Sequence, residues 1–301
     1  MLFKRQKELE AGAETLVKKG QFREMWDRLK KNPRGMISLC VVLLILLLAL
    51  TAPVLFDYQT YVVDQHAAQR FSGPSIDHWF GTDQVGRDIL ARLIWGARVA
   101  VQIGFGTTIC SLAVSIVIGC SAAFFGGVVD VVIMRIMDIF QTIPSLIMAM
   151  AICAGLGNGM WQLMIAIGVG QIPMFVRMIR AKGLSVANME FIEAGRALGA
   201  TNMWLIFRYL LPNIISIVIV QGTMCISSAV MTGATLSFIG LGVKAPTPEW
   251  GAMLQSAMES IQVHPYLLIA PGLALVITSL SVNTLGDCLR DAFDPQLKGK
   301  T

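Results

Sequence analysis

The sequence predicts an all-α membrane protein with six transmembrane helices. Apolar residues make up 55% of the 301 positions, and charged residues make up only 14%. Several apolar stretches reach the roughly 18–20 residues with which a helix crosses a bilayer. Lysines and arginines also gather in alternate connections between these stretches, which is typical of a chain that crosses repeatedly. A water-soluble domain is therefore excluded. Because membrane topology accounts for the basic excess, nucleic-acid binding is not indicated.

The first element is a basic segment, residues 1–35, that precedes the first apolar stretch. Its apolar side chains recur at helical spacing and are Phe22, Met25, Trp26 and Leu29. This pattern is typical of a helix that lies in the headgroup region, and Asn32-Pro33 is expected to end it. A solvated basic tail is the alternative. No small-residue cleavage site follows the first apolar stretch, so a cleavable signal peptide is not predicted.

Six apolar stretches then form a membrane domain over residues 36–285, and residues 286–301 form a tail. The predicted spans are Met36–Phe56, Val99–Phe125, Val131–Ala154, Trp161–Val176, Asn213–Leu241 and His264–Leu285. The fourth span is the shortest, and Gly168, Gly170 and Pro173 are expected to break it.

The basic residues also predict an orientation. If the N-terminus lies in the cytoplasm, 19 of the 24 lysines and arginines fall in cytoplasmic segments and 5 fall outside. Because these residues are enriched in cytoplasmic loops, we expect a multi-pass protein of the cell membrane with both termini in the cytoplasm. The connection 186–212 then also lies in the cytoplasm.

This connection, residues 186–212, is predicted to form two short helices. Asn188 suits an N-cap and Gly199 suits a left-handed residue at a helix end, which gives a helix from Met189 to Leu198. Thr201 is expected to cap the second helix, and Pro212 to open the fifth span. A helix rich in Ala and Gly has a nearly bare surface around which the groove of another protein can close. An ordinary interfacial connection is the alternative.

The same connection resembles the EAA loop of ABC-importer permeases. That loop reads Glu-Ala-Ala, three residues, Gly, nine residues, Ile, one residue and Leu-Pro. Here the pattern falls on Glu193, Ala194, Gly195, Gly199, Tyr209, Leu211 and Pro212, with every spacing kept. Gly195 replaces the second Ala, which puts the rigidity of that turn in doubt, and Tyr209 replaces the Ile.

The resemblance is not limited to this loop. From about Trp26 to Leu297 the chain is similar to the C subunits of dipeptide and oligopeptide permeases. The motifs that carry it are Gly81-Thr82-Asp83, Gly86-Arg87-Asp88, Arg92, Gly96-Ala97-Arg98, Phe125-Gly126-Gly127, Ser237-Phe238-Ile239-Gly240-Leu241-Gly242, Pro246-Thr247-Pro248-Glu249-Trp250-Gly251 and Leu285-Gly286-Asp287-Cys288-Leu289-Arg290-Asp291.

This resemblance implies a type I ABC-importer permease fold with six spans and a cytoplasmic coupling helix. It also implies a homologous second permease, two cytoplasmic ATPases, an extracytoplasmic binding protein and a peptide substrate. The residues expected to couple to an ATPase are Glu193, Ala194, Gly195, Arg196, Ala197, Leu198, Gly199, Ala200, Leu211 and Pro212. Import of nickel, metal chelates or another small solute is the alternative within the family.

The chain itself is not expected to be an enzyme or to bind a cofactor, because ATP and Mg²⁺ would bind the partner ATPases. The C-terminal Gly299-Lys300-Thr301 mimics part of a phosphate loop, but Asp294 stands where that motif needs glycine. The scattered cysteines and histidines predict no metal site. A secondary transporter or channel is a second alternative, although no inverted repeat supports it.

A row of polar residues on the fifth span is a candidate solute path. Gln221, Ser228, Thr232 and Thr235 follow one another at intervals of seven, four and three residues, which places them on one helical face. Uncharged hydrogen-bonding groups suit a peptide backbone. The alternative is that they bond to neighbouring helices or to their own backbone.

Two further features receive functional predictions. The loop with Pro246, Pro248 and Trp250 is expected to form a rigid aromatic surface that contacts the binding protein; an aromatic anchor at the membrane interface is the alternative. Arg135 and Asp138, at i and i+3, are expected to pair with each other. A substrate or proton contact is the alternative for that pair.

Overall fold

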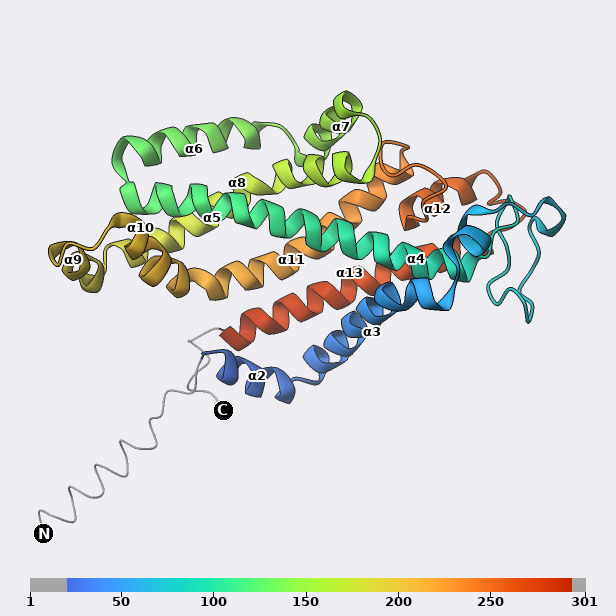
Figure 1. Ribbon diagram of the computed structural model, residues 1–301, viewed down its shortest axis with the longest axis horizontal. Helices are drawn as coiled ribbons and strands as arrows, with labels where there is room; N and C mark the ends of the chain where they lie inside the picture. Colours follow the sequence, from blue (N-terminus) through green and yellow to red (C-terminus); the bar gives the residue numbers. More distant parts are fainter. Residues whose placement is uncertain (1–20, 294–301) are drawn as a thin grey trace, which may run out of the picture.

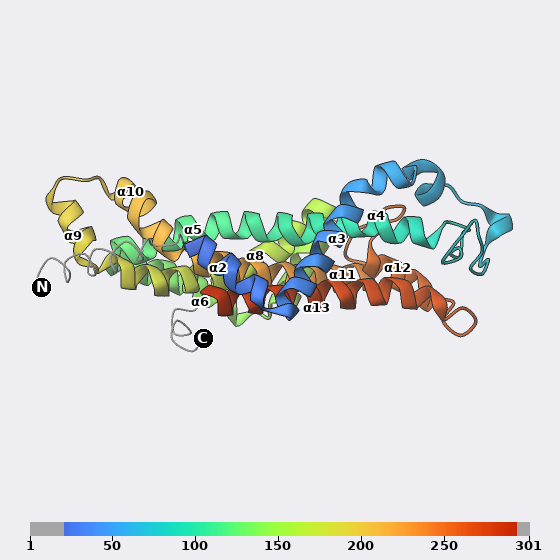
Figure 2. The same cartoon turned by 90° about the horizontal axis from the view of Figure 1, so that it is seen from below.

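The computed structural model describes residues 21–293, and within this range the chain is helical, with one isolated β-bridge between Thr82 and Asp88. The helices form an elongated bundle (Figure 1). One end of the bundle, here called the α9 end, carries α9 and α10. The opposite end, here called the α12 end, carries α12 and the loops between residues 57 and 88, as Figure 2 also shows.

Five helical segments are long and apolar enough to cross a membrane. They are α3 (Pro33–Leu55), α4 with η3 and α5 (Ile89–Val101, Gln102–Gly106, Thr107–Phe125), α8 (Met160–Ala187), α10 with η4 and α11 (Asn202–Leu205, Ile206–Leu210, Leu211–Phe238) and α13 (Tyr266–Phe293). The shorter elements are α2 (Gln21–Lys31), η1 (Tyr58–Val63), η2 (Ala67–Gln69), α6 (Gly127–Thr142), α7 (Ser145–Leu156), α9 (Glu190–Ala197) and α12 (Trp250–Met258).

The predicted third span is a broken one. Helices α6 and α7 are together long and apolar enough to cross a membrane, and they meet at an angle of 85°. The break lies at Ile143-Pro144, where Ile143 adopts an extended conformation (φ −96°, ψ 125°). A residue before proline avoids the helical region, so the bend follows from the local sequence. The six predicted spans are thus five long segments and this bent pair.

The prediction that the fourth span breaks at its glycines and proline is wrong. Helix α8 continues for 28 residues through Gly168, Gly170 and Pro173. Its small residues let α5 approach closely: Ser111 Oγ of α5 donates to the Gly168 carbonyl over 3.1 Å. A Cβ built at Gly183 would lie 2.6 Å from Ala123 Cβ. Packing between small residues therefore outweighs the low helix propensity of these positions.

The second span begins ten residues earlier than predicted. Asp88 caps α4 by accepting a hydrogen bond from the Ala91 amide over 2.7 Å. The segment Ile89–Phe125 has 37 residues and is therefore about 55 Å long, well beyond the roughly 30 Å of a hydrocarbon core. Part of it must stand outside the bilayer.

Helix α2 packs against the end of α13. The Leu29 side chain is buried beside Leu285 and Cys288. Arg28 donates to the Ala292 carbonyl over 3.3 Å. As predicted, the helix ends before Asn32-Pro33, and the Asn32 side chain then caps α3 by accepting from the Arg34 amide.

Candidate functional site

Helix α9 is the predicted coupling helix, one residue shorter at each end. Asn188 is not its N-cap: it ends α8, and Met189 precedes α9 without a side-chain cap. At the other end Gly199 has φ +80°, as predicted. The Gly199 amide bonds the Arg196 carbonyl and the Ala200 amide bonds the Gly195 carbonyl, each over 3.0 Å. This pair of bonds is a Schellman motif, which stops the helix sharply.

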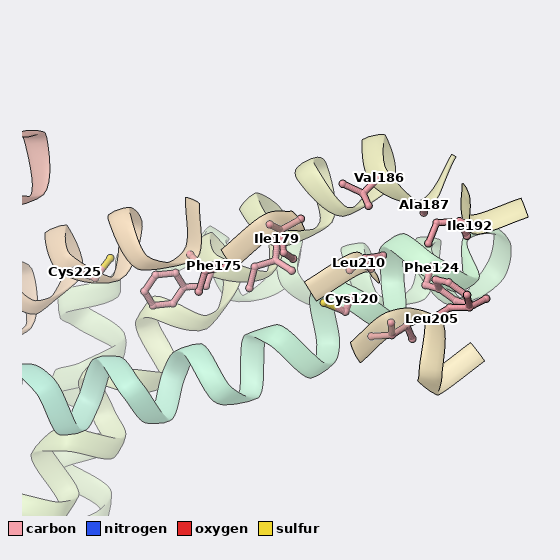
Figure 3. Close-up of a cluster of buried hydrophobic side chains, with 13 residues drawn as sticks. Cys120, Phe124, Phe175, Ile179, Val186, Ala187, Ile192, Leu205, Leu210 and Cys225 are labelled. Atoms are coloured by element: carbon pink, nitrogen blue, oxygen red, sulfur yellow. The ribbon is translucent and has the colours of Figure 1, made fainter. Parts of the chain in front are cut away.

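One side of α9 is anchored in the bundle. Ile192 is fully buried in a cluster with Leu205 and Leu210, and Phe124 of α5 lies beside it. Figure 3 shows this cluster running from Ile192 along the bundle to Phe175 and Cys225. A displacement of α9 would therefore also displace the side chains beneath it, because a close-packed core transmits strain.

The opposite side of α9, here called the outer face, is not covered by any other part of residues 21–293. Its members are Glu193, Ala194, Ala197 and Leu198, all exposed. Leu198 is 88% exposed. The outer face thus consists of one leucine, two alanines and one carboxylate. The predicted bare surface is therefore present.

The departure from the EAA pattern at Gly195 has a structural reason. A Cβ built at Gly195 would lie 2.7 Å from Leu205 Cδ2, and Leu205 is fully buried. The Leu205 side chain thus occupies the space that an alanine methyl would take. The turn that seemed weakened by glycine is filled from the neighbouring helix.

Arg196 joins α9 to the end of α5. Its guanidinium lies 4.7 Å from the centre of the Phe124 ring, and its Nη2 lies 3.5 Å from the Phe124 carbonyl oxygen. Such cation–π contacts contribute about 0.5–1 kcal/mol at exposed sites. Phe124 is distant in sequence, so spacing gave no signal for this contact.

The second short helix is continuous with the fifth span. Thr201 accepts a hydrogen bond from the Trp204 amide over 3.4 Å, as predicted for a cap. From Asn202 the helical path continues through the π-helical turn η4 into α11, with Pro212 in the first turn of α11. Leu211 is half-buried and Pro212 is exposed. Helix α9 is therefore joined to α8 through two residues and to α11 through α10.

The four polar residues on α11 all retain exposed surface. Ser228 and Thr235 are exposed, and Gln221 and Thr232 are half-buried. Thr235 Oγ1 donates to the Met231 carbonyl of its own helix over 2.8 Å. Ser227, one residue along, instead faces inward and bonds Ser279 on α13 over 2.9 Å.

The predicted aromatic surface at Pro246–Trp250 is wrong. Trp250 is 3% exposed and its Nε1 donates to the Leu93 carbonyl over 3.0 Å. A Cβ built at Gly96 would lie 2.5 Å from that Nε1, so glycine makes room for the indole. Pro248 is also buried, and Pro246 alone of the three is exposed. The motif locks α12 onto α4.

The other signature motif of the α12 end is also internal. Asp83 Oδ2 lies 2.7 Å from Arg87 Nε and 3.7 Å from Arg92 Nε. Arg92 also donates to the carbonyls of Val62 and Pro246. These charges hold the loop 57–88 against the start of α4, and a buried arginine is stable only when it is paired in this way.

The expected Arg135–Asp138 pair is weak, and Asp138 has a closer partner. Arg135 Nη1 lies 3.9 Å from one Asp138 oxygen, whereas Arg177 Nη2 of α8 lies 2.5 Å from the other. Sequence spacing could suggest only the local partner. Among residues 21–293 no three His, Cys, Asp or Glu side chains gather in a way that could hold a metal ion.

Comparison with known proteins gives this architecture a family. Residues 115–299 match the binding-protein-dependent transport system inner membrane component, and residues 20–74 match the N-terminal transmembrane domain of oligopeptide transport permease C. The chain belongs to this family and is a permease of an ABC importer of the dipeptide and oligopeptide type.

Two relatives are similar over nearly their whole length. The dipeptide transport system permease protein DppC of Alkalihalophilus pseudofirmus is 39% identical over 92% of this chain and 90% of its own. The glutathione transport system permease protein GsiD of Escherichia coli is 36% identical over 99% of both chains. Both relatives carry the name of a transport permease.

Among solved structures, two crystal forms of the inward-facing MetNI methionine ABC transporter share the fold. They have TM-scores of 0.55 and 0.56 at 20% identity, and they cover 68% of this chain and 97% of the other. The type I ABC-importer permease fold predicted from the EAA pattern is thereby confirmed.

Proposed function

We propose that this permease imports dipeptides or oligopeptides, forms half of the translocation path, and receives the ATPase stroke through α9. One observation carries the proposal: α9 exposes Glu193 and Leu198 on one side, while its other side and both its ends are tied to membrane-spanning helices. A force applied to the outer face would therefore reach α8 and α11.

The partners follow from this role. A homologous permease completes the path, and one of the two ATPases of the assembly docks on α9. ATP and Mg²⁺ bind those ATPases, so this chain needs no cofactor and carries out no hydrolysis itself. A cytoplasmic α9 end is supported by the basic residues, because 19 of the 24 lysines and arginines then lie inside.

The binding protein then docks at the α12 end. Of the three residues first assigned to that contact, Pro246 has the exposure to take part. The four polar residues of α11 face the solute, because each keeps surface that no helix within residues 21–293 covers. Their hydroxyl and amide groups offer temporary partners to a peptide backbone. The names of the relatives support peptide-type cargo, since they specify a dipeptide and glutathione.

The test is uptake into liposomes that contain the chain with its second permease and both ATPases, with the binding protein added outside. Labelled dialanine, tetra-alanine, glutathione and Ni²⁺ are offered separately. ATP-dependent uptake of a peptide, abolished by an inactive ATPase, is the expected result. Uptake of Ni²⁺ without any peptide would instead support the metal alternative. Uptake that continues with inactive ATPases would contradict the importer mechanism.

A further inference from the structure

Helix α6 has little apolar packing to hold it in place. It runs along one edge of the bundle (Figure 1), and Met137 is its single buried side chain. Most of its apolar residues are strongly exposed, as Val128 (79%) and Ile139 (67%) illustrate. Contacts of another kind must therefore fix its position relative to the neighbouring helices.

Two arginine–aspartate pairs join α6 to α8. Arg180 and Asp130 form a bidentate pair: Arg180 Nε donates to Asp130 Oδ1, and Arg180 Nη2 donates to Asp130 Oδ2 over 2.5 Å. Arg177 Nη2 bonds Asp138 Oδ1 over 2.5 Å. Both arginines lie on α8 and both aspartates on α6. A bidentate pair fixes direction as well as distance.

Two ion pairs constrain the orientation of α6 on α8 more than a single pair would. Asp130 and Asp138 are eight residues apart, or about 12 Å along α6 at the helical rise per residue. With a single pair α6 could pivot on α8, whereas two pairs fix its orientation. Asp130 and Arg180 are the less exposed pair, with side chains 14% and 31% exposed, whereas Asp138 and Arg177 are 46% and 44% exposed. The Asp130–Arg180 pair therefore contributes more, because solvent screens an exposed pair.

Both ends of α6 are joints. At its start Gly126 and Gly127 have φ of +61° and +52°, and neither has a neighbouring atom within 4 Å of an added Cβ. At its end the chain leaves the helix at Ile143 and turns by 85° into α7. Helix α6 is thus a rod between two non-helical joints.

Helix α8 connects this rod to the coupling segment. It runs without a break from Arg177 through Arg180 to Ala187, and α9 begins at Glu190. A displacement of α9 that reaches α8 therefore acts first on the part of α8 that carries the two arginines.

We infer that the pairs Asp130–Arg180 and Asp138–Arg177 make α6 move with α8 and α9 as one unit that bends against α7 at Ile143-Pro144. This inference rests on the proposed function, since it extends the ATPase stroke into the third span. The four charged residues are positioning residues: they act on α6 and do not contact the solute.

The first test exchanges charges in the complete reconstituted complex. The variants are Asp130→Arg, Arg180→Asp and the double exchange, and the readout is solute taken up per ATP hydrolysed, using whichever of labelled dialanine, tetra-alanine or glutathione the wild type accumulates. A defect of folding alone changes the amount of complex but leaves this ratio unchanged. We expect each single exchange to lower the ratio about 3- to 10-fold, within the range by which positions between coupled sites act, and the double exchange to restore most of it.

The matched control is Arg135→Gln. It removes a positive charge from the same helix, but Arg135 is 80% exposed and 3.9 Å from its nearest carboxylate oxygen. Its ratio should equal that of the wild type. Unchanged ratios in both single exchanges, or a double exchange that inserts and remains as poor as the singles, would overturn the inference.

A second measurement does not depend on these variants. Spin labels are placed in a chain whose six cysteines are replaced by alanine, one pair at Val131 and Lys182 (α6 to α8) and another at Val131 and Ile147 (α6 to α7). We expect the α6–α8 distance to be the same in the ATP-free and vanadate-trapped states, and the α6–α7 distance to shift. A shifted α6–α8 distance, or a constant α6–α7 distance, contradicts the inference. If the wild-type complex itself shows no ATP-driven uptake, the proposed function fails instead.

Discussion

Both ends of this bundle carry sequence motifs of the family, but the motif residues are exposed at one end and buried at the other. At the α9 end Glu193 of the EAA pattern, and Leu198 just before the pattern's Gly199, are turned outward and exposed. At the α12 end Trp250 is buried and Arg92 is paired inside the protein. Family motifs are therefore exposed at one end, where we propose that an ATPase docks, and buried at the other, where they hold helices of this chain together.

The largest expected effect tests the internal role of the α12 end. Replacing Trp250 by alanine removes the hydrogen bond to Leu93 and leaves a cavity above Gly96. We expect a loss of about 3–5 kcal/mol in the free energy of unfolding, the usual range for a buried tryptophan. Thermal unfolding of the purified chain in detergent measures it. Trp79→Ala is the matched control, since Trp79 is 70% exposed at the same end, and its stability should hardly change. Equal losses in both variants would contradict the internal role.

The next effect tests the outward role of the α9 end. We expect Leu198→Glu and Glu193→Lys each to leave thermal stability within about 0.5 kcal/mol of the wild type, as for most surface changes. Each should lower binding-protein-stimulated ATPase activity about 30-fold or more, if these residues form the centre of the contact.

The control for that experiment is Ile76→Glu, because Ile76 is 93% exposed but lies in the loops of the α12 end. Ile76 lies at the end of the bundle opposite α9, so an ATPase that docks on α9 does not contact it. If Leu198→Glu and Glu193→Lys insert and hydrolyse ATP normally under stimulation, the outer face of α9 is not the coupling surface.

The sequence predicted the exposed end better than the buried one, for a physical reason. The C-terminal stop of α9 at Gly199 and the cap at Thr201 depend on residues a few positions apart, and the capping rules describe such local effects. The position of Trp250 depends on Leu93 and Gly96, more than 150 residues away. The contact of Trp250 with Leu93 could therefore not be predicted from the spacing of residues within Pro246–Trp250.

The same distinction explains the errors along the spans. The bend at Ile143-Pro144 lies in the local sequence and was missed because apolar length alone defined the third span. The continuity of α8 through Pro173 depends instead on close packing with α5, which one sequence does not display. Asp138 was assigned to Arg135 because Arg177 comes from another helix.

A smaller effect on stability and stimulated ATPase activity is expected at Gly199, which ends α9. Gly199 has φ +80°, a conformation that costs other L-residues about 1–2 kcal/mol, least for asparagine. We expect Gly199→Val to lower both thermal stability and stimulated ATPase activity, because it disturbs the Schellman turn. Gly199→Asn should retain most of both, since nothing lies within 4 Å of an added Cβ there. If both variants lose the same stability and stimulated ATPase activity, the size of the side chain at position 199 matters and the left-handed backbone conformation does not.

The smallest effect concerns the one glycine of the EAA pattern that packing explains. Gly195→Ala gains up to about 1 kcal/mol of helix propensity, but its methyl would meet Leu205 Cδ2 at 2.7 Å. These terms oppose each other, so the single variant should change the free energy of unfolding by less than about 1 kcal/mol. Leu205→Ala alone should cost about 2–5 kcal/mol as a buried truncation. If Leu205 fills the space of the missing methyl, Gly195→Ala should be more favourable in the Leu205→Ala background than in the wild type. Thermal unfolding of the four proteins gives this interaction energy, and a value of zero would mean that the contact between α9 and Leu205 does not explain the glycine.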